Sequence, residues 1–200
     1  MILTYPNDIL KAMSTPFSKV TEELRVTADE LAKELADSDI GVGLAAPQIG
    51  VNKRIFAIKE DHADGKEKKA KIAVNFYINP QIVDTFEKQK TYVALVNDDQ
   101  TEPFLEGCLS VPRVWGTVKR WTKIKAKWQE IEEGQLKDRE EILQGLMAII
   151  FQHELDHLDG ILFIDHINKD NGKMYLVEDN KKTEISFSEL TNLGSLTKSK

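Results

Sequence analysis

A pair of histidines with a glutamate between them gives this chain its clearest chemical pattern. His153, Glu154 and His157 form the sequence His-Glu-x-x-His, and residues four apart lie on the same face of a helix. Both imidazoles can therefore point at one divalent metal, and Glu154 lies beside the open position, where a carboxylate can take a proton from water. The spacing indicates metal-assisted hydrolysis. The alternative is a pair of core histidines without a metal.

The third ligand decides the class of enzyme, because catalytic sites of this kind commonly have three protein ligands and one open position. An extended peptidase motif needs a further histidine at position 163, where this chain has Phe163. Glu178 follows His157 by 21 residues, which suits a zinc peptidase with a downstream glutamate ligand. The single cysteine, Cys108, lies upstream beside Gly107. The residues alone leave both Glu178 and Cys108 as candidates for the third ligand.

Two segments rich in small residues accompany this pattern. Residues 41–50 contain three glycines, and residues 106–112 place glycine next to the cysteine. Such segments let a backbone approach a ligand closely. The first is not a phosphate-binding loop, because Ala46 takes the place of the third glycine and no Lys-Ser/Thr pair follows. Gln48 is its only side chain with strong hydrogen-bonding groups.

A buried helix must position the two histidines. Asp138 and Glu141 fit the cap and carboxylate of a helix start, and Gly160 fits its end. The residues between them are apolar nearly all round, which predicts a helix in the interior of the domain.

Hydrophobic periodicity and turn residues predict the other elements. A capping box at Thr27 and Glu30 predicts an amphipathic helix that ends near residues 37–38. Asn7 or Asp8 fits the cap of a short N-terminal helix. The expected strands are 54–58, 72–78, 81–86, 91–96, 118–131, 174–177 and 184–187, with a charged loop at 59–71 and a frayed tail at 195–200. We therefore expect an α+β domain of antiparallel strands around one central buried helix.

Alternation within residues 118–131 gives that strand one buried and one wet face. Ile124, Ala126 and Trp128 form the apolar face. The opposite face carries Lys123, Lys125 and Lys127. A solvated surface is the favoured interpretation, and a binding protein that contacts the ribosome or nucleic acid is the alternative without catalysis.

Composition excludes several other classes. The chain has 200 residues, 41% of them hydrophobic and 30% charged, with a net charge of −6, which is typical of one globular domain without a nucleic-acid partner. No apolar run approaches the ~20 residues of a membrane span. The N-terminus lacks the pattern of a signal peptide, so the expected location is cytoplasmic. One cysteine excludes an intramolecular disulfide.

Three segments in order resemble the signature motifs of the peptide deformylases. Residues 41–48 resemble the motif G-x-G-L-A-A-x-Q, residues 106–110 resemble E-G-C-L-S, and residues 152–157 resemble Q-H-E-x-D-H. The resemblance implies a catalytic domain over residues 1–165, with residues 166–200 as a C-terminal extension. It also implies the activity of that family, which is metal-dependent removal of the formyl group from N-terminal formyl-methionine with release of formate.

The resemblance assigns roles to individual residues. It implies Cys108, His153 and His157 as metal ligands and Glu154 as general base and then acid. The side-chain amide of Gln48 and the backbone N–H of Leu109 would stabilise the oxyanion. Asp156 and Arg120 would form a structural ion pair. The substrate-binding positions that it implies are Val42, Gly43, Glu106, Gly107, Leu146, Ile149 and Ile150.

By the same resemblance, the expected cofactor is one Fe²⁺ ion, for which Zn²⁺, Ni²⁺ or Co²⁺ can substitute. The expected partners are N-formyl-methionyl nascent peptides, with transient ribosome contact, no membrane and no specific nucleic acid. We expect a monomer in the bacterial cytoplasm or in an organelle. The link at residues 88–104 is longer than is usual in this family.

Overall fold

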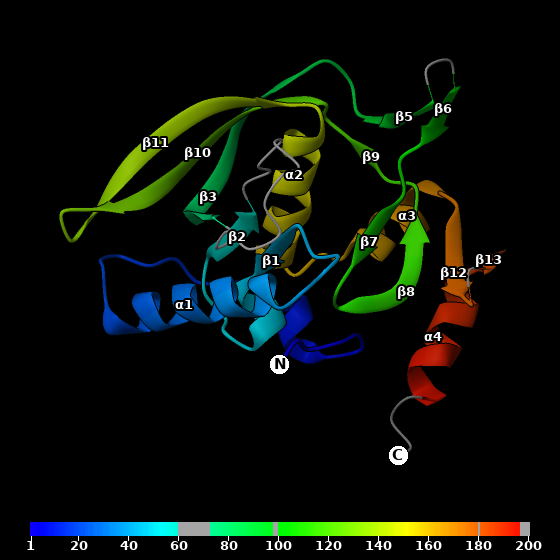
Figure 1. Ribbon diagram of the computed structural model, residues 1–200, viewed down its shortest axis with the longest axis horizontal. Helices are drawn as coiled ribbons and strands as arrows, with labels where there is room; N and C mark the ends of the chain where they lie inside the picture. The colour runs from blue at the N-terminus through cyan, green and yellow to red at the C-terminus, as the bar shows by residue number, and fades with distance from the viewer. Residues whose placement is uncertain (60–72, 98–99, 180, 197–200) are drawn as a thin grey trace.

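A computed structural model describes residues 1–59, 73–97, 100–179 and 181–196. Two antiparallel sheets and several helices surround one central helix, α2 (Figure 1). The helices are η1 (Asp8–Lys11), α1 (Glu22–Ala36), η2 (Ala46–Ile49), α2 (Leu146–Leu158), α3 (Phe163–Asp170) and α4 (Phe187–Leu196). This architecture confirms the expected α+β fold around a buried helix. No helix in the described part of the chain is long and apolar enough to cross a membrane.

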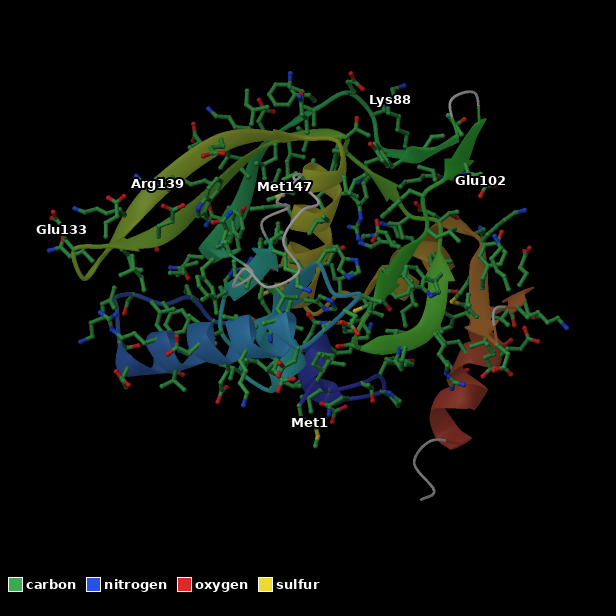
Figure 2. The ribbon with its side chains drawn as sticks, in the orientation of Figure 1. Met1, Lys88, Glu102, Glu133, Arg139 and Met147 are labelled. Carbon is green, nitrogen blue, oxygen red and sulfur yellow. The ribbon has the colours of Figure 1, made fainter. Side chains whose placement is uncertain are left out.

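The larger sheet arches over one side of α2 (Figure 1). Its strand order is β1 (Gly43–Ala45), β2 (Ile55–Lys59), β3 (Val74–Phe86), β10 (Lys123–Glu132) and β11 (Gln135–Gln144). The long hairpin β10–β11 extends away from the core, and Glu133 at its turn is fully in view in Figure 2. Ile124, Ala126 and Trp128 face inward and are buried as expected. They pack with Phe151 and Leu158 of α2.

The smaller sheet flanks α2 on the other side and has the order β13 (Lys181–Glu184), β12 (Met174–Glu178), β8 (Val111–Gly116) and β7 (Glu106–Cys108). Two short pairs complete the described strands: β4 (Lys90–Thr91) with β9 (Lys119–Arg120), and β5 (Val93–Asn97) with β6 (Gln100–Pro103). Met174 and Leu190 pack with Val111 and Val114. The C-terminal segment is therefore joined to the strands that carry the cysteine.

The predicted start of the central helix was wrong. Residues 138–144 belong to β11, which pairs along its whole length with β10, and α2 begins at Leu146. Leu143 points inward while Ile142 is exposed. Buried and exposed side chains therefore alternate at these positions with the period of a strand, and not with the helical period that the sequence predicts. Gly145, with a φ of +62°, makes the change from strand to helix. Gly160, with a φ of +71°, follows the helix end as expected.

The first long helix also begins elsewhere than predicted. Thr21 is its N-cap and accepts a hydrogen bond from the backbone N–H of Leu24 at 3.2 Å. Thr27 instead donates its hydroxyl to the carbonyl of Glu23 at 2.7 Å inside the helix. The end at Ala36 and the cap of the short helix by Asn7 agree with expectation.

Five strand predictions need correction. The expected strand 91–96 is divided between β4 and β5, and 118–131 is divided between β9 and β10. The two strands expected at 72–78 and 81–86 form the single strand β3, in which Asn79 has a φ of +50° and its side chain bonds to Phe17 and Gln129. The last hairpin closes with β13 at 181–184, and Phe187 begins α4. Ser195 lies in α4, while 197–200 and most of the expected loop at 59–71 lie outside the described residues.

Acidic residues of β11 neutralise two of the three lysines on the wet face of β10. Lys125 lies 2.6 Å from Glu140, and Lys127 lies 2.8 Å from Asp138. These cross-strand pairs fit a solvated surface better than a nucleic-acid patch.

Candidate metal centre

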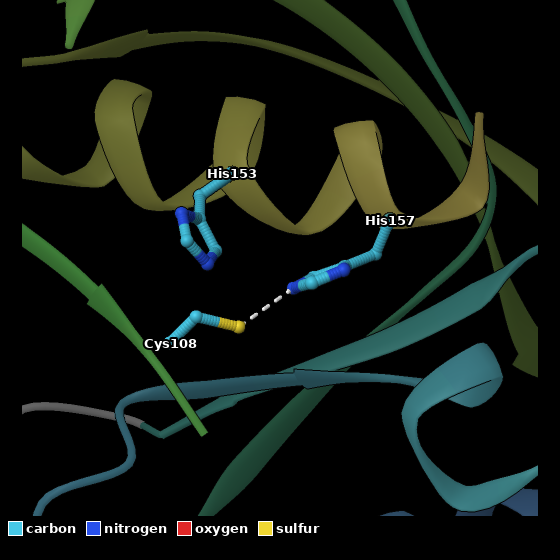
Figure 3. A group of neighbouring side chains, drawn as sticks. All are labelled: Cys108, His153 and His157. Carbon is cyan, nitrogen blue, oxygen red and sulfur yellow. Dashed lines mark hydrogen bonds between the residues drawn. The ribbon is translucent and has the colours of Figure 1, made fainter. Parts of the chain in front are cut away.

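The helix α2 presents its two histidines to the cysteine of β7 (Figure 3). The Nε2 atom of His157 lies 3.2 Å from Cys108 Sγ. One ligand atom from each of Cys108, His153 and His157 falls within 4.8 Å of the others. A thiolate and two imidazoles are ligands that suit a borderline divalent transition metal.

The electrostatics of this cluster favour a bound cation. Burial by itself raises the pKa of Cys108, but the imidazoles of His157 and His153 outweigh it and lower that pKa to about 5. Burial likewise lowers the pKa of His153, yet Cys108 and Glu106 raise it well above its ordinary value. The thiol is therefore a thiolate at neutral pH, which is the form that binds metals. The donor set, its convergence and its charge all fit a metal.

Glu106 and Arg120 orient one of the ligands. The Oε2 atom of Glu106 lies 2.9 Å from His153 Nδ1, which directs Nε2 of that ring toward the cluster. Arg120 donates to both oxygens of Glu106, each at 2.9 Å, and also to Asp156. The ion pair of Asp156 with Arg120 agrees with the sequence-based expectation. Both carboxylate oxygens of Glu106 are engaged inside the protein, while the residue itself lines the cavity beside the cluster, so its expected role in substrate binding stays a prediction.

Glu154 lies buried beside the cluster. Burial raises its pKa to about 7, although His153 and His157 oppose the shift. Its Oε2 atom is buried and has no hydrogen-bond partner within the described chain, so the carboxylate is free to receive a proton. A Cβ at Gly43 would lie 2.3 Å from Glu154 Oε1. Only glycine at position 43 leaves room for this carboxylate.

Gln48 is fixed by its neighbours. Its Oε1 accepts a hydrogen bond from the backbone N–H of Ala45 at 2.8 Å, so its Nε2 is the donor that faces the site. Nε2 lies 3.1 Å from Ser110 Oγ and 3.5 Å from Cys108 Sγ. Ser110 is fully buried and was not singled out from the sequence, although its place in the E-G-C-L-S segment could have shown it.

A cavity of about 420 Å³ opens over the cluster. Its lining includes six of the seven expected substrate-binding residues, together with Gln48, Leu109 and Glu154; the six are Val42, Gly43, Glu106, Gly107, Ile149 and Ile150. Leu146 is absent from this lining and is exposed at the first turn of α2, so its expected role in substrate binding stays a prediction.

Three further residues near the site were missed or given another role. Phe104 and Leu105 follow the short β5–β6 pair and line the cavity. His166, which the sequence analysis did not single out, lies 2.9 Å from Asp156 and joins the ion-pair network of Arg120. Glu178, the alternative third ligand, instead pairs with Arg113. The peptidase hypothesis therefore loses its ligand.

Comparison with known proteins decides the family. The sequence profile of polypeptide deformylases matches residues 1–173. The chain belongs to the peptide deformylase family. It is a metal-dependent hydrolase that removes the N-formyl group from nascent peptides, as the shared motifs and the site together show.

Individual members of the family show how far the likeness extends. The chain is 38% identical to the peptide deformylase of Rhizorhabdus wittichii over 84% of this chain and 86% of that protein. It is 40% identical to the one from Fusobacterium nucleatum over 84% of this chain and 83% of that protein. A crystal structure of the Acinetobacter baumannii enzyme with bound Met-Ala-Ser matches with a TM-score of 0.66 and 29% identity, covering 84% of this chain and 97% of that one.

Proposed function

We propose that Cys108, His153 and His157 bind the metal of this deformylase, and that Glu154, Gln48 and Leu109 carry out the hydrolysis. The observation that supports this assignment most strongly is the convergence of three ligand atoms within 4.8 Å. This cluster lies beside the buried carboxylate of Glu154, whose Oε2 atom has no hydrogen-bond partner among the described residues.

Glu154 moves the proton that the reaction requires. Cys108, His153 and His157 would hold a divalent metal, which would supply a water of lowered pKa, from about 15.7 towards 7, and would polarise the formyl carbonyl. Glu154 takes a proton from the water while the water oxygen forms a bond to the formyl carbon. It returns that proton to the amine nitrogen as the C–N bond breaks, which releases formate and the free N-terminus. In the metal-free protein, burial raises the pKa of Glu154 to about 7.

Gln48 and Leu109 stabilise the charge that develops on the formyl oxygen. The Gln48 amide is held in a fixed orientation by Ala45 and Ser110. The backbone N–H of Leu109 supplies the second donor. Removal of one such donor typically costs roughly 10²–10³ in rate.

The cavity accommodates the formylated end of the substrate. Val42, Ile149 and Ile150 offer an apolar surface for the methionine side chain. Strands β1 and β7 each form the outer edge of their sheet among the described strands, so Gly43 and Gly107 can meet an extended peptide backbone. The Met-Ala-Ser bound to the Acinetobacter baumannii relative has the composition expected of a deformylated product.

Fe²⁺ is the proposed metal, and Zn²⁺, Ni²⁺ or Co²⁺ can replace it. One thiolate and two imidazoles accept all of these ions, and iron is the choice that the family resemblance supplies. We further propose that residues 1–165 form the catalytic domain and residues 166–200 its extension. We also propose that the enzyme acts as a monomer in the cytoplasm and contacts the ribosome transiently.

The test is formate release from formyl-Met-Ala-Ser by protein purified without oxygen and loaded with Fe²⁺ or Ni²⁺. Rapid release, with none from the N-acetyl analogue, is the expected result. The matched variant Glu154→Gln should keep its metal content and lose at least about 10²-fold in kcat. Full activity of that variant would contradict the role of Glu154, and no release by the metal-loaded protein would contradict the proposed function.

A further inference from the structure

The indole of Trp115 lies across the glycine that precedes the cysteine ligand. Trp115 on β8 is the register partner of Gly107 on β7. A Cβ at Gly107 would lie 2.7 Å from Cε3 and Cζ3 of Trp115. The ring therefore occupies the space where any other residue at 107 would carry its side chain. Trp115 lines the cavity and is 36% exposed, so part of this residue stays accessible to a ligand.

This position brings the ring within reach of a bound peptide. β7 is the outer strand of its sheet among the described residues, and a substrate that runs along it takes the place of the next strand. Side chains of cross-strand neighbours project from the same face of a sheet. The substrate residue opposite Gly107 thus shares its face with Trp115. The backbone of the substrate and that of β8 are separated by two strand spacings, roughly 10 Å. Because Gly107 has no side chain, the indole of Trp115 fills the space between them.

The charged side chains near Trp115 have partners within the protein. Arg113 pairs with Glu178, and the carboxylate of Glu106 is buried against Arg120. Ile40, which is 73% exposed, adds a second apolar side chain to the lining. A charged substrate side chain would find no unpaired opposite charge among these residues, whereas an apolar one would find the indole and Ile40.

We propose that Trp115 makes this deformylase selective for nascent chains that carry an apolar or aromatic side chain at the residue opposite Gly107. The inference rests on the proposed deformylase activity. Because side chains alternate along a strand, only one of the second and third substrate residues meets the indole, and selectivity is confined to that position.

Two peptide series test the proposal: formyl-Met-X-Ala and formyl-Met-Ala-X, with X as Phe, Leu, Asp or Lys. The measurement is the ratio of kcat/KM for Phe to that for Asp at each position. We expect a ratio of about ten at one position, the order that an apolar contact contributes to discrimination, and a ratio near one at the other. Ratios within one protein cancel differences in folding or metal content between variants.

Two substitutions identify the residue responsible. Trp115→Thr keeps a residue that suits a strand and should bring the Phe-to-Asp ratio to about one. Trp115→Lys should invert it in favour of Asp. The control Ile142→Thr changes an exposed apolar side chain on β11, outside the cavity lining, and should keep the wild-type ratio.

The outcomes separate the two proposals. Turnover of all peptides with equal ratios in the wild-type protein would overturn the selectivity and leave the deformylase activity standing. A ratio that persists in Trp115→Thr and does not invert in Trp115→Lys would also overturn it. No turnover of any formyl peptide by metal-loaded protein would instead contradict the proposed function itself.

Discussion

Arg120 donates two hydrogen bonds to the carboxylate of Glu106, one to each oxygen and each 2.9 Å long. Both side chains are buried in the interior of the protein. Glu106 in turn contacts the metal-ligand candidate His153. The orientation of one proposed ligand therefore depends on a buried ion pair between β9 and β7. This pair determines both the stability and the metal affinity that we expect of the protein.

Replacement of Arg120 by Met should destabilise the protein strongly. The substitution leaves the buried carboxylates of Glu106 and Asp156 without their cation, and breaking such a pair typically costs about 3–5 kcal/mol. Urea unfolding of the metal-free protein measures the loss. Arg139→Met is the matched control, because Arg139 forms an exposed pair with Glu130 that contributes about 0–1 kcal/mol. Equal effects of the two substitutions would contradict the structural role of Arg120.

Acid should weaken the metal-free protein through Glu106. Burial alone raises its pKa, but Arg120 and His153 outweigh burial and lower the pKa from 4.5 to about 2. Between those values the unfolded chain binds a proton that the folded protein does not, so stability is complete above pH 4.5 and falls as the pH drops towards 2.

Urea titrations at pH 5 and pH 3 test this dependence. The loss of stability should be smaller in Glu106→Gln than in the wild type, because the variant has no carboxyl to titrate at this position. An unchanged loss would show that the Glu106 carboxyl does not contribute to the acid sensitivity.

The third ligand can be identified by metal content. Cys108→Ser should lose most of its metal, since a serine hydroxyl is a far poorer ligand than a thiolate for these ions. Glu178→Gln should retain it, because Glu178 pairs with Arg113 at the protein surface. Metal analysis after dialysis measures both. The reverse result would restore the zinc-peptidase hypothesis.

Gly43→Ala should impair catalysis more than stability. The added methyl would lie 2.3 Å from Glu154 Oε1 and push the carboxylate from its position. We expect kcat for formyl-Met-Ala-Ser to fall by about 10²-fold, with metal content preserved. Ala45→Gly on the same strand, which removes a methyl instead of adding one, is the control for strand stability. A Gly43→Ala variant with normal kcat would show that the carboxylate can move without loss.

Local sequence geometry determined the paired imidazoles of the site. His153 and His157 are four residues apart, and any helix places residues at this spacing on the same face. The two side chains therefore share a face whatever the surrounding fold. The choice of Cys108 over Glu178 came from the family resemblance, because no local rule connects a cysteine on β7 to a histidine 45 residues later in the chain. Packing of β7 against α2 brings them together.

Tertiary structure alone decided where the strand β11 ends and the helix α2 begins, and which contacts hold the site residues in place. Residues 138–144 carry spacings that fit a helix, and pairing with β10 made them a strand, since ladder hydrogen bonds and burial of Leu143 outweigh weak local preferences. The partner of Glu106 and the position of Trp115 over Gly107 depend on which strands become neighbours. The sequence by itself thus determined which groups could do chemistry, while long-range strand pairing decided which residues hold them and which surface the substrate meets.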